Sequence, residues 1–128
     1  MKRVVLAALA FLSFGGAAHA QDAAAGERVY VRCKVCHQIG ETAKNSVGPE
    51  LNGLIGRRSA SVAGFSYSAA MKSSDLQWTE ETLADYLKSP RQKIPGTKMT
   101  FAGLSKDEDI ANVIAYIKQF QSDGKKAQ

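Results

Sequence analysis

Three stretches of the chain carry apolar residues at helical spacing. The clearest follows Ser105, which with Glu108 makes the Ser-x-x-Glu pattern of a capping box and predicts a helix that begins there. Its apolar positions recur at i, i+3, i+4 and i+7, on one helix face, and are Ile110, Val113, Ile114 and Ile117. Beyond this helix, Gly124 and Lys125-Lys126 predict a polar tail.

A second helix is predicted after Thr79, a residue that favours helix N-caps and is followed by two acidic residues. Leu83, Tyr86 and Leu87 share one of its faces at i, i+3 and i+4, so they are predicted to be buried. Pro90 is predicted to stop this helix, because the residue before a proline avoids the helical conformation.

The remaining main helix is predicted from about Asp22, as its N-cap, to about Cys36. Val29, Tyr30 and Cys33 lie on neighbouring turns of one of its faces. These three helices make the fold class all-α.

Residues 38–77 show no sustained periodicity, and only a short helical piece is predicted there, at about 68–74. The segment contains five glycines, at positions 40, 48, 53, 56 and 64. So long an irregular segment is unusual inside a compact domain. It becomes reasonable if the loops wrap a large apolar object.

The first twenty residues have the features of a secretory signal. Lys2 and Arg3 precede an eleven-residue apolar run, and Ala18-His19-Ala20 makes an A-x-A cleavage pattern. The run is shorter than the roughly 20 residues that span a bilayer, so a membrane anchor is disfavoured. We therefore expect cleavage after Ala20, a mature domain at residues 21–128 and a periplasmic location.

Composition narrows the possible functions. A chain of 128 residues has room for one domain, and cleavage would lower its formal net charge from +5 to +3, which is too small an excess for a nucleic-acid binder. Apart from alanine and cysteine, residues 21–128 contain only 28 apolar side chains. So thin a core suggests that something other than protein fills the middle.

Cys33-Lys34-Val35-Cys36-His37 is a C-x-x-C-H sequence, the attachment pattern of a c-type haem. Two thiols one turn apart can join the two vinyl groups of one porphyrin, and the adjacent imidazole then points at the iron. A redox-active disulfide, a zinc site and a structural disulfide are the alternatives. A redox-active disulfide is typical of a strand–helix–strand context, which is not predicted here. A zinc site needs four ligands, more than the two cysteines and one histidine of residues 21–128 supply, and a structural disulfide would not need His37.

His37 is the only histidine left after cleavage, so a second axial histidine within the chain is excluded. The sixth ligand is then a methionine, another side chain or nothing, and the methionines left after cleavage are Met71 and Met99. Met71 falls in the short helical piece, where methionine usually fills gaps. Met99 follows an irregular Ile-Pro-Gly-Thr-Lys segment that can present a thioether to a metal, so it is the preferred sixth ligand.

The chain resembles the class I cytochromes c, specifically mitochondrial cytochrome c and the short bacterial cytochromes c2. The resemblance spans Gly26 to about Gln121. Besides the C-x-x-C-H sequence, it is carried by Gly48-Pro49-Glu50-Leu51-Asn52-Gly53-Leu54 with Gly56-Arg57, Gly64-Phe65-Ser66-Tyr67-Ser68, Trp78, Tyr86-Leu87, and Pro95-Gly96-Thr97-Lys98-Met99 with Phe101-Ala102-Gly103.

The resemblance implies a cytochrome c fold, with three main helices and Gly-rich loops around one haem c. It implies covalent attachment through Cys33 and Cys36, with His37 and Met99 as the axial ligands. In the family, the carbonyl at the Pro49 position accepts a hydrogen bond from the axial histidine. The other positions that resemble haem-contacting residues are Arg57, Tyr67, Ser68 and Trp78 at the propionates, and Tyr86, Thr97 and Phe101 on the methionine side.

The resemblance also implies contact between the first and last helices, at Gly26 and Tyr30 against Ile114 and Tyr116 or their neighbours. Met71 is a departure, because mitochondrial members often have an asparagine there, near a propionate and a buried water. The segment between Tyr30 and Cys33 is one residue shorter than in mitochondrial members and resembles the bacterial ones.

An iron with two protein ligands has no open site, so electron transfer is the expected function and enzymatic activity is not expected. The resemblance implies a donor of the cytochrome bc1 type and, as acceptor, cytochrome c oxidase or a photosynthetic reaction centre. A haem peroxidase and a gas-binding haem protein are the alternatives, and both need a labile or absent sixth ligand. We expect a monomer that docks on membrane redox complexes through a basic haem-edge surface made by Arg32, Lys34, Arg91, Lys93, Lys98 and Lys106.

Overall fold

The computed structural model describes residues 21–128, so the predicted export signal lies outside the described residues. This part of the chain contains no strand, and the all-α prediction is confirmed. Its helices are α1 (Ala23–Tyr30), α2 (Ala69–Ser73), α3 (Glu80–Lys88), α4 (Pro90–Lys93) and α5 (Asp107–Ile117). No helix within residues 21–128 combines the length and the apolar character needed to cross a bilayer.

The start of α1 was predicted correctly and its end was not. The Asp22 side chain caps the helix by accepting hydrogen bonds from the Ala24 and Ala25 N–H groups, at 2.9 and 3.1 Å. The helix ends at Tyr30 instead of Cys36. Several backbone hydrogen bonds of residues 31–36 span three residues instead of four, such as that from Cys36 N–H to Cys33 O, so the chain tightens into successive turns there.

The predicted cap of α3 is present, because Thr79 accepts the Thr82 N–H and the Thr82 hydroxyl accepts the Thr79 N–H. Pro90 both ends α3 and opens α4, where a proline at the first turn loses no helical hydrogen bond. Helix α4 was not predicted from the sequence.

The predicted capping box of the last helix was wrong. The N-cap of α5 is Lys106, one residue after Ser105, and no side chain caps the helix. Three acidic residues in the first turn, Asp107, Glu108 and Asp109, instead complement the positive end of the helix dipole. The acidic run stabilises the same end of the helix without a side-chain cap.

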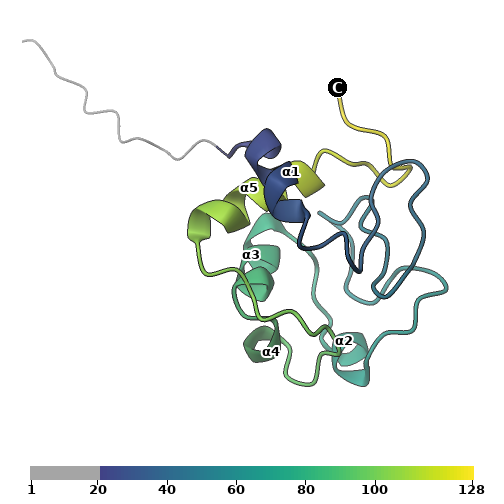
Figure 1. Ribbon diagram of the computed structural model, residues 1–128. Coiled ribbons are helices and arrows are strands. Elements are labelled where there is room, and N and C mark those ends of the chain that lie inside the picture. Colours follow the sequence, from purple (N-terminus) through teal and green to yellow (C-terminus); the bar gives the residue numbers. More distant parts are fainter. Residues whose placement is uncertain (1–20) are drawn as a thin grey trace, which may run out of the picture.

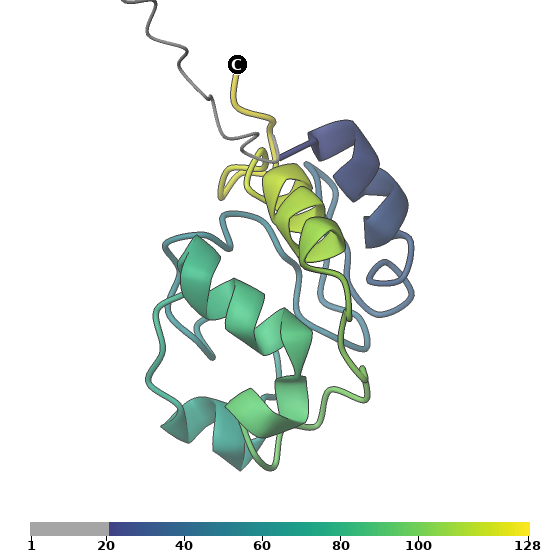
Figure 2. The ribbon, with the colours of Figure 1, turned by 90° about the vertical axis from the view of Figure 1, so that its left-hand side faces the viewer.

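The helices divide the molecule into two ends. In Figures 1 and 2, α1 crosses α5 at one end, α2 and α4 lie at the other, and α3 lies between them. Gly26 allows the close crossing, since a β-carbon there would overlap the Asn112 carbonyl and lie 2.9 Å from Tyr116 Cβ. The predicted contact between the first and last helices is present.

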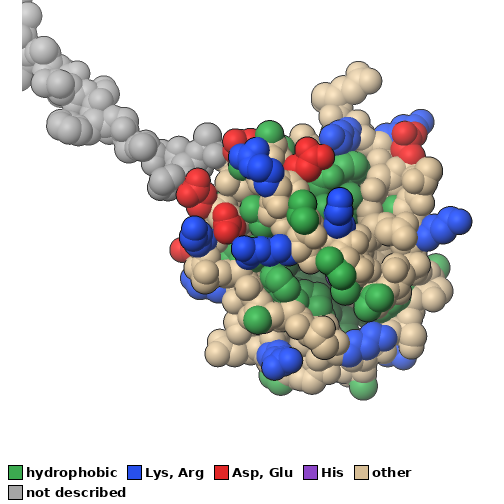
Figure 3. Space-filling view, viewed as in Figure 1, with side chains coloured by type: hydrophobic (Ala, Val, Ile, Leu, Met, Phe, Trp, Pro, Cys, Tyr) green, Lys and Arg blue, Asp and Glu red, His purple; other side chains and the backbone are tan. Residues whose placement is uncertain are grey.

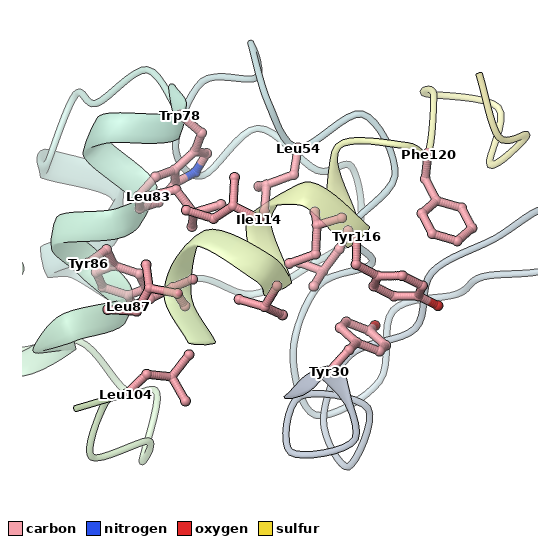
Figure 4. Close-up of a cluster of buried hydrophobic side chains, with 14 of the residues drawn as sticks. Tyr30, Leu54, Trp78, Leu83, Tyr86, Leu87, Leu104, Ile114, Tyr116 and Phe120 are labelled. Carbon is pink, nitrogen blue, oxygen red and sulfur yellow. The ribbon is translucent and has the colours of Figure 1, made fainter. Parts of the chain in front are cut away.

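The buried core joins α3, α5 and the loops (Figure 4). The three residues of α3 that were predicted to be buried are buried, and so are the four residues of the predicted apolar face of α5. Tyr30 of α1 packs on Tyr116 with ring centroids 5.1 Å apart, and Phe120 packs on the other side of Tyr116 at 5.3 Å. A row of three aromatic rings therefore joins α1 to the end of the chain.

The last residues are mostly polar and, apart from Gly124, exposed, as the predicted polar tail requires, but they fold back instead of extending away. The chain turns back after Phe120, and this C-terminal hook (residues 119–127) is closed by backbone hydrogen bonds from Gln121 N–H to Lys125 O and from Ala127 N–H to Gln119 O. Gly124 is buried at its turn. The pattern of polar residues did not predict this turn, because backbone groups make its contacts.

We predict that Gly26→Val lowers the free energy of unfolding by about 3 kcal/mol, because the new side chain must displace the backbone of α5. Ala24→Val, at an exposed position of the same helix, is the control for the lower helix propensity of valine. Denaturant unfolding followed by circular dichroism measures both. Equal losses in the two variants would contradict the prediction.

Candidate functional site

His37 is held in one tautomer by the backbone. Its Nδ1 lies 2.7 Å from Pro49 O, and because a carbonyl oxygen only accepts, Nδ1 carries the proton. Burial lowers the pKa of His37, and nearby Arg57 lowers it further, whereas the bond to Pro49 opposes the shift. The ring is therefore kept neutral, with the lone pair of Nε2 available to a metal.

The orientation of the His37 ring is set by its close neighbours. A β-carbon at Gly48 would overlap the ring, lying 2.7 Å from Nδ1 and 2.9 Å from Nε2. Gly48 N–H donates to Cys36 O at 2.8 Å, and the Tyr30 hydroxyl donates to His37 O at 3.2 Å. The ring thus lies directly against backbone, with no room for a side chain between them.

Cys33 and Cys36 are both partly buried thiols that are not joined in a disulfide. Burial raises the pKa of Cys33 to about 11, an effect that Arg32 opposes and Cys36 reinforces. Cys36 N–H donates to Cys33 O at 3.0 Å, so the two residues are one tight turn apart. Residues 21–128 contain no cluster of three or more His, Cys, Asp or Glu able to hold a metal ion.

Met99 lies in a closed ring of hydrogen bonds after the turn from Ile94 to Thr97. Its N–H donates to Thr97 Oγ1 at 3.4 Å, Thr97 Oγ1 lies 3.0 Å from the Tyr86 hydroxyl, and that hydroxyl contacts Met99 Sδ at 3.7 Å. Burial raises the pKa of Tyr86, so its phenol stays protonated and can donate to the sulfur. The thioether is thereby fixed without being part of a helix.

Met71 has different surroundings. It belongs to α2, packs against the core and lies with its Sδ 3.9 Å from Ser74 Oγ. Ser74 Oγ also donates to Met71 O at 2.7 Å. Met71 is therefore held within its own helical turn.

Arg57 and Trp78, two of the predicted propionate residues, are joined through the backbone, because Trp78 N–H donates to Arg57 O at 2.9 Å. The Arg57 side chain donates to Asn52 O and Glu50 O, at 3.0 and 3.1 Å, and lies 3.6 Å from the Glu50 carboxylate. The ring of buried Trp78 lies 5.2 Å from that of Tyr86. Trp78 thus connects the Arg57 region with the Met99 region.

Tyr67, Ser68 and Phe101 have mainly structural contacts. The Tyr67 hydroxyl accepts the Val62 N–H at 3.0 Å, and Ser68 Oγ accepts the Met71 N–H and caps α2. Phe101 is partly buried against the core. None of these contacts brings the three side chains to His37.

Three residues that contribute to this site were not predicted from the sequence. Glu50 holds Arg57, Asn52 bonds both backbone groups of Gly40, and Gly48 makes room for the His37 ring. All three belong to the quoted segment that begins at Gly48, but their residue types alone do not indicate these contacts. Asn52 had a usable signal, since a buried asparagine beside a Gly-rich loop usually bonds backbone.

Hydrophobic side chains gather in a hollow on the face of the molecule seen in Figure 3, with Lys and Arg side chains around it. The donor set fits a covalently bound haem: two unjoined thiols, an imidazole with its Nε2 lone pair available and a fixed thioether. Both the apolar surface and these donors are what such a group requires.

Comparison with known proteins identifies the family of this chain. A family model described as cytochrome c matches residues 23–121. The chain is similar to cytochrome c2 of Blastochloris viridis, with 50% identity over 126 residues, covering 98% of this chain and 99% of that protein. It is also 50% identical to cytochrome c of Gossypium barbadense over 99 residues, covering 77% of this chain and 89% of that one.

Among solved structures, the fold is similar to that of cytochrome cH from Methylobacterium extorquens. The TM-score is 0.73, with 41% sequence identity, and the match covers 77% of this chain and 98% of that chain.

We predict that Gly48→Ala displaces the His37 ring and lowers the free energy of unfolding by about 2 kcal/mol, because the added methyl overlaps the ring. Gly56→Ala is the control, since Gly56 has a φ of +95° but no atom within 4 Å of a built β-carbon. Both variants should be destabilised, and nuclear magnetic resonance should show a shifted His37 Nδ1–H signal only in Gly48→Ala. An unchanged His37 signal would contradict the steric argument.

Proposed function

Because the chain belongs to the cytochrome c family, we propose that it is a periplasmic monohaem carrier of single electrons. Its donor is a quinol-oxidising complex of the cytochrome bc1 type, and its acceptor is a terminal complex such as cytochrome c oxidase or a photosynthetic reaction centre. The family assignment makes the protein an electron-transfer protein and not an enzyme. It also implies a covalently attached haem c.

In this proposal Cys33 and Cys36 hold the haem, and His37 and Met99 are its axial ligands. When bound, haem c supplies an iron that gains and loses one electron. The observation that carries the proposal is the neutral His37 ring, whose Nδ1–H is bound to Pro49 O and whose Nε2 is available. A redox-active or structural disulfide between Cys33 and Cys36 would give this arrangement of His37 no role.

Met99 decides between electron transfer and the two alternative haem functions. Thr97 and Tyr86 hold its thioether, so the sixth position would be filled by a fixed side chain. A peroxidase or a gas carrier needs that position open. A soft thioether in an apolar pocket also favours ferrous iron, and the reduction potential is raised as a result.

The other site residues are assigned supporting roles. Arg57, Tyr67, Ser68 and Trp78 are proposed to lie at the haem propionates, where Arg57 offers a cation already oriented by Glu50. Tyr86 and Phe101 are proposed to enclose the methionine side together with Thr97. Pro49 acts only through its carbonyl.

A basic haem-edge surface is proposed to dock the protein on its partners, made by Arg32, Lys34, Arg91, Lys93, Lys98 and Lys106. Lys93 pairs with Asp85, and Lys98 bonds Ser66 O and lies 4.7 Å from the centroid of the Phe65 ring. The other four have no ion-pair partner among residues 21–128. Val35 lies within the C-x-x-C-H sequence, and Val47 precedes Gly48, which contacts the His37 ring. These two valines are 76% and 72% exposed and add apolar contact area.

Export is part of the proposal. Cleavage after Ala20 would begin the mature chain at Gln21, next to the Asp22 cap of α1. The Asp22 N–H donates to the Asn112 side chain at 2.9 Å, so the mature N-terminus would be tied to α5. The mature protein is proposed to be a monomer.

Met99→Ala is predicted to open the sixth position of the haem-loaded protein, so that the ferrous form binds carbon monoxide and the reduction potential falls. Met71→Ala is the matched control, because its side chain is held within α2, and it should stay indifferent to carbon monoxide. Absorption spectra with and without carbon monoxide measure both. If Met99→Ala binds the gas no faster than the wild type, the ligand assignment is wrong.

Electron transfer from a purified bc1-type complex is predicted to slow by about tenfold as ionic strength rises, because salt screens the attraction between a basic and an acidic surface. Arg91→Gln should reduce this salt dependence. Lys125→Gln removes the same charge from the C-terminal hook and should leave it unchanged. A salt-independent rate in the wild type would contradict electrostatic docking.

A further inference from the structure

We propose that the C-terminal hook positions His37, by holding the loop whose Pro49 carbonyl fixes the ring. Gly124 is the contact residue of the hook, and Gly40 and Asn52 pass the contact on. The inference rests on the proposed function, since it concerns the residue proposed as an axial ligand.

The hook has a defined shape of its own. Phe120 and Lys126 pair in antiparallel fashion, and the Asp123 carboxylate accepts the Lys125 N–H at 2.9 Å inside the turn. The Lys126 ammonium lies 5.4 Å from the centroid of the Phe120 ring and 6.0 Å from that of Tyr116. These contacts attach the hook to the aromatic row at the end of α5, so it is a fixed support.

Two glycines bring the hook and the loop into backbone contact. Gly124 has a φ of +81°, and a β-carbon there would overlap the Gly40 carbonyl and lie 2.6 Å from Glu41 N. On the other side, Gly53 N–H donates to Phe120 O at 3.1 Å, and a β-carbon at Gly53 would lie 3.0 Å from Ser122 Cα. The hook therefore touches the loop at both Gly40 and Gly53.

Asn52 joins these two contact points. Its side chain is buried, accepts the Gly40 N–H at 2.9 Å and donates to Gly40 O at 2.9 Å. Leu51 precedes Asn52 in the chain, and its N–H donates to Gln38 O at 3.0 Å. Two residues before Leu51 is Pro49, whose carbonyl accepts the His37 Nδ1–H.

A chain of contacts thus links the hook to the His37 ring. The loop segment that follows His37 and the loop segment that contains Pro49 are held together at Gln38 and Gly40, and the hook contacts Gly40. If the hook is lost, the two loop segments can separate locally and the Pro49 carbonyl can move away from His37.

Hydrogen exchange of the haem-loaded protein tests this proposal. Gly124→Ala should accelerate exchange of the Gly40 and Leu51 N–H groups and of His37 Nδ1–H by about tenfold, while exchange in α3 stays as in the control. The control is Gly64→Ala, since Gly64 has a φ of +77° and its built β-carbon has no neighbour nearer than 3.9 Å. The control therefore carries the same backbone strain without the contact.

A second variant ends the chain at Gln121 and removes the turn of the hook without creating an overlap. It should show the same local acceleration, and it decides the question alone if Gly124→Ala does not fold. Equal acceleration in α3 and in the loop would reduce the hook to a general stabilising element and overturn the proposal. Unchanged exchange at Gly40, Leu51 and His37 would overturn it as well.

The carbon monoxide spectrum of the wild type keeps this proposal separate from the proposed function. A wild-type protein that binds the gas readily would contradict the closed His–Met carrier, whatever the exchange experiment shows. If the wild type does not bind the gas, and if Gly124→Ala and the shortened chain exchange their N–H groups like Gly64→Ala, only the proposed role of the hook is contradicted.

Discussion

The close approach of α1 to α5 at Gly26 is the contact on which the rest of the structure depends. With no side chain at this position, the α1 backbone reaches the Asn112 carbonyl, and the Tyr30 ring then packs at a tilt against the Tyr116 ring. Tyr30 also donates to His37 O, so the helix crossing sets where the C-x-x-C-H turn begins. A shift of α1 would be passed directly to the proposed iron ligand.

The two proposed ligands are fixed by different physical means. His37 lies against backbone, between the Gly48 contact and the Pro49 carbonyl. Met99 is held by hydroxyl groups, through Thr97 and Tyr86. Reduction and oxidation of a metal between such ligands would require little rearrangement, which is the property that rapid electron exchange needs.

Much of the fold was predictable because α3 and α5 carry clear apolar periodicity, and all of their predicted core residues are buried. The C-x-x-C-H sequence likewise indicates haem attachment without further structural information. Helix ends were less predictable. The observed N-cap of α5 is Lys106, one residue after the predicted Ser105. The chain between Tyr30 and Cys36 turns more tightly than the helix predicted to end at Cys36. The backbone contacts of Gly48 and Gly124 could not be predicted from the sequence, because a glycine does not indicate which part of the chain lies against it.

The pairing of α1 with α5 also has a consequence for synthesis of the chain. Helix α1 has eight residues, too few to be stable alone in water, and its partner is the last helix to be made. Until α5 emerges, α1 lacks the helix that it packs on, so the segment that follows α1 is held only from the side of residues 48–52. Both Cys33 and Cys36 are partly buried in the folded chain. The order of synthesis therefore leaves an interval, before α1 and α5 pair, in which these thiols are less enclosed than in the finished fold.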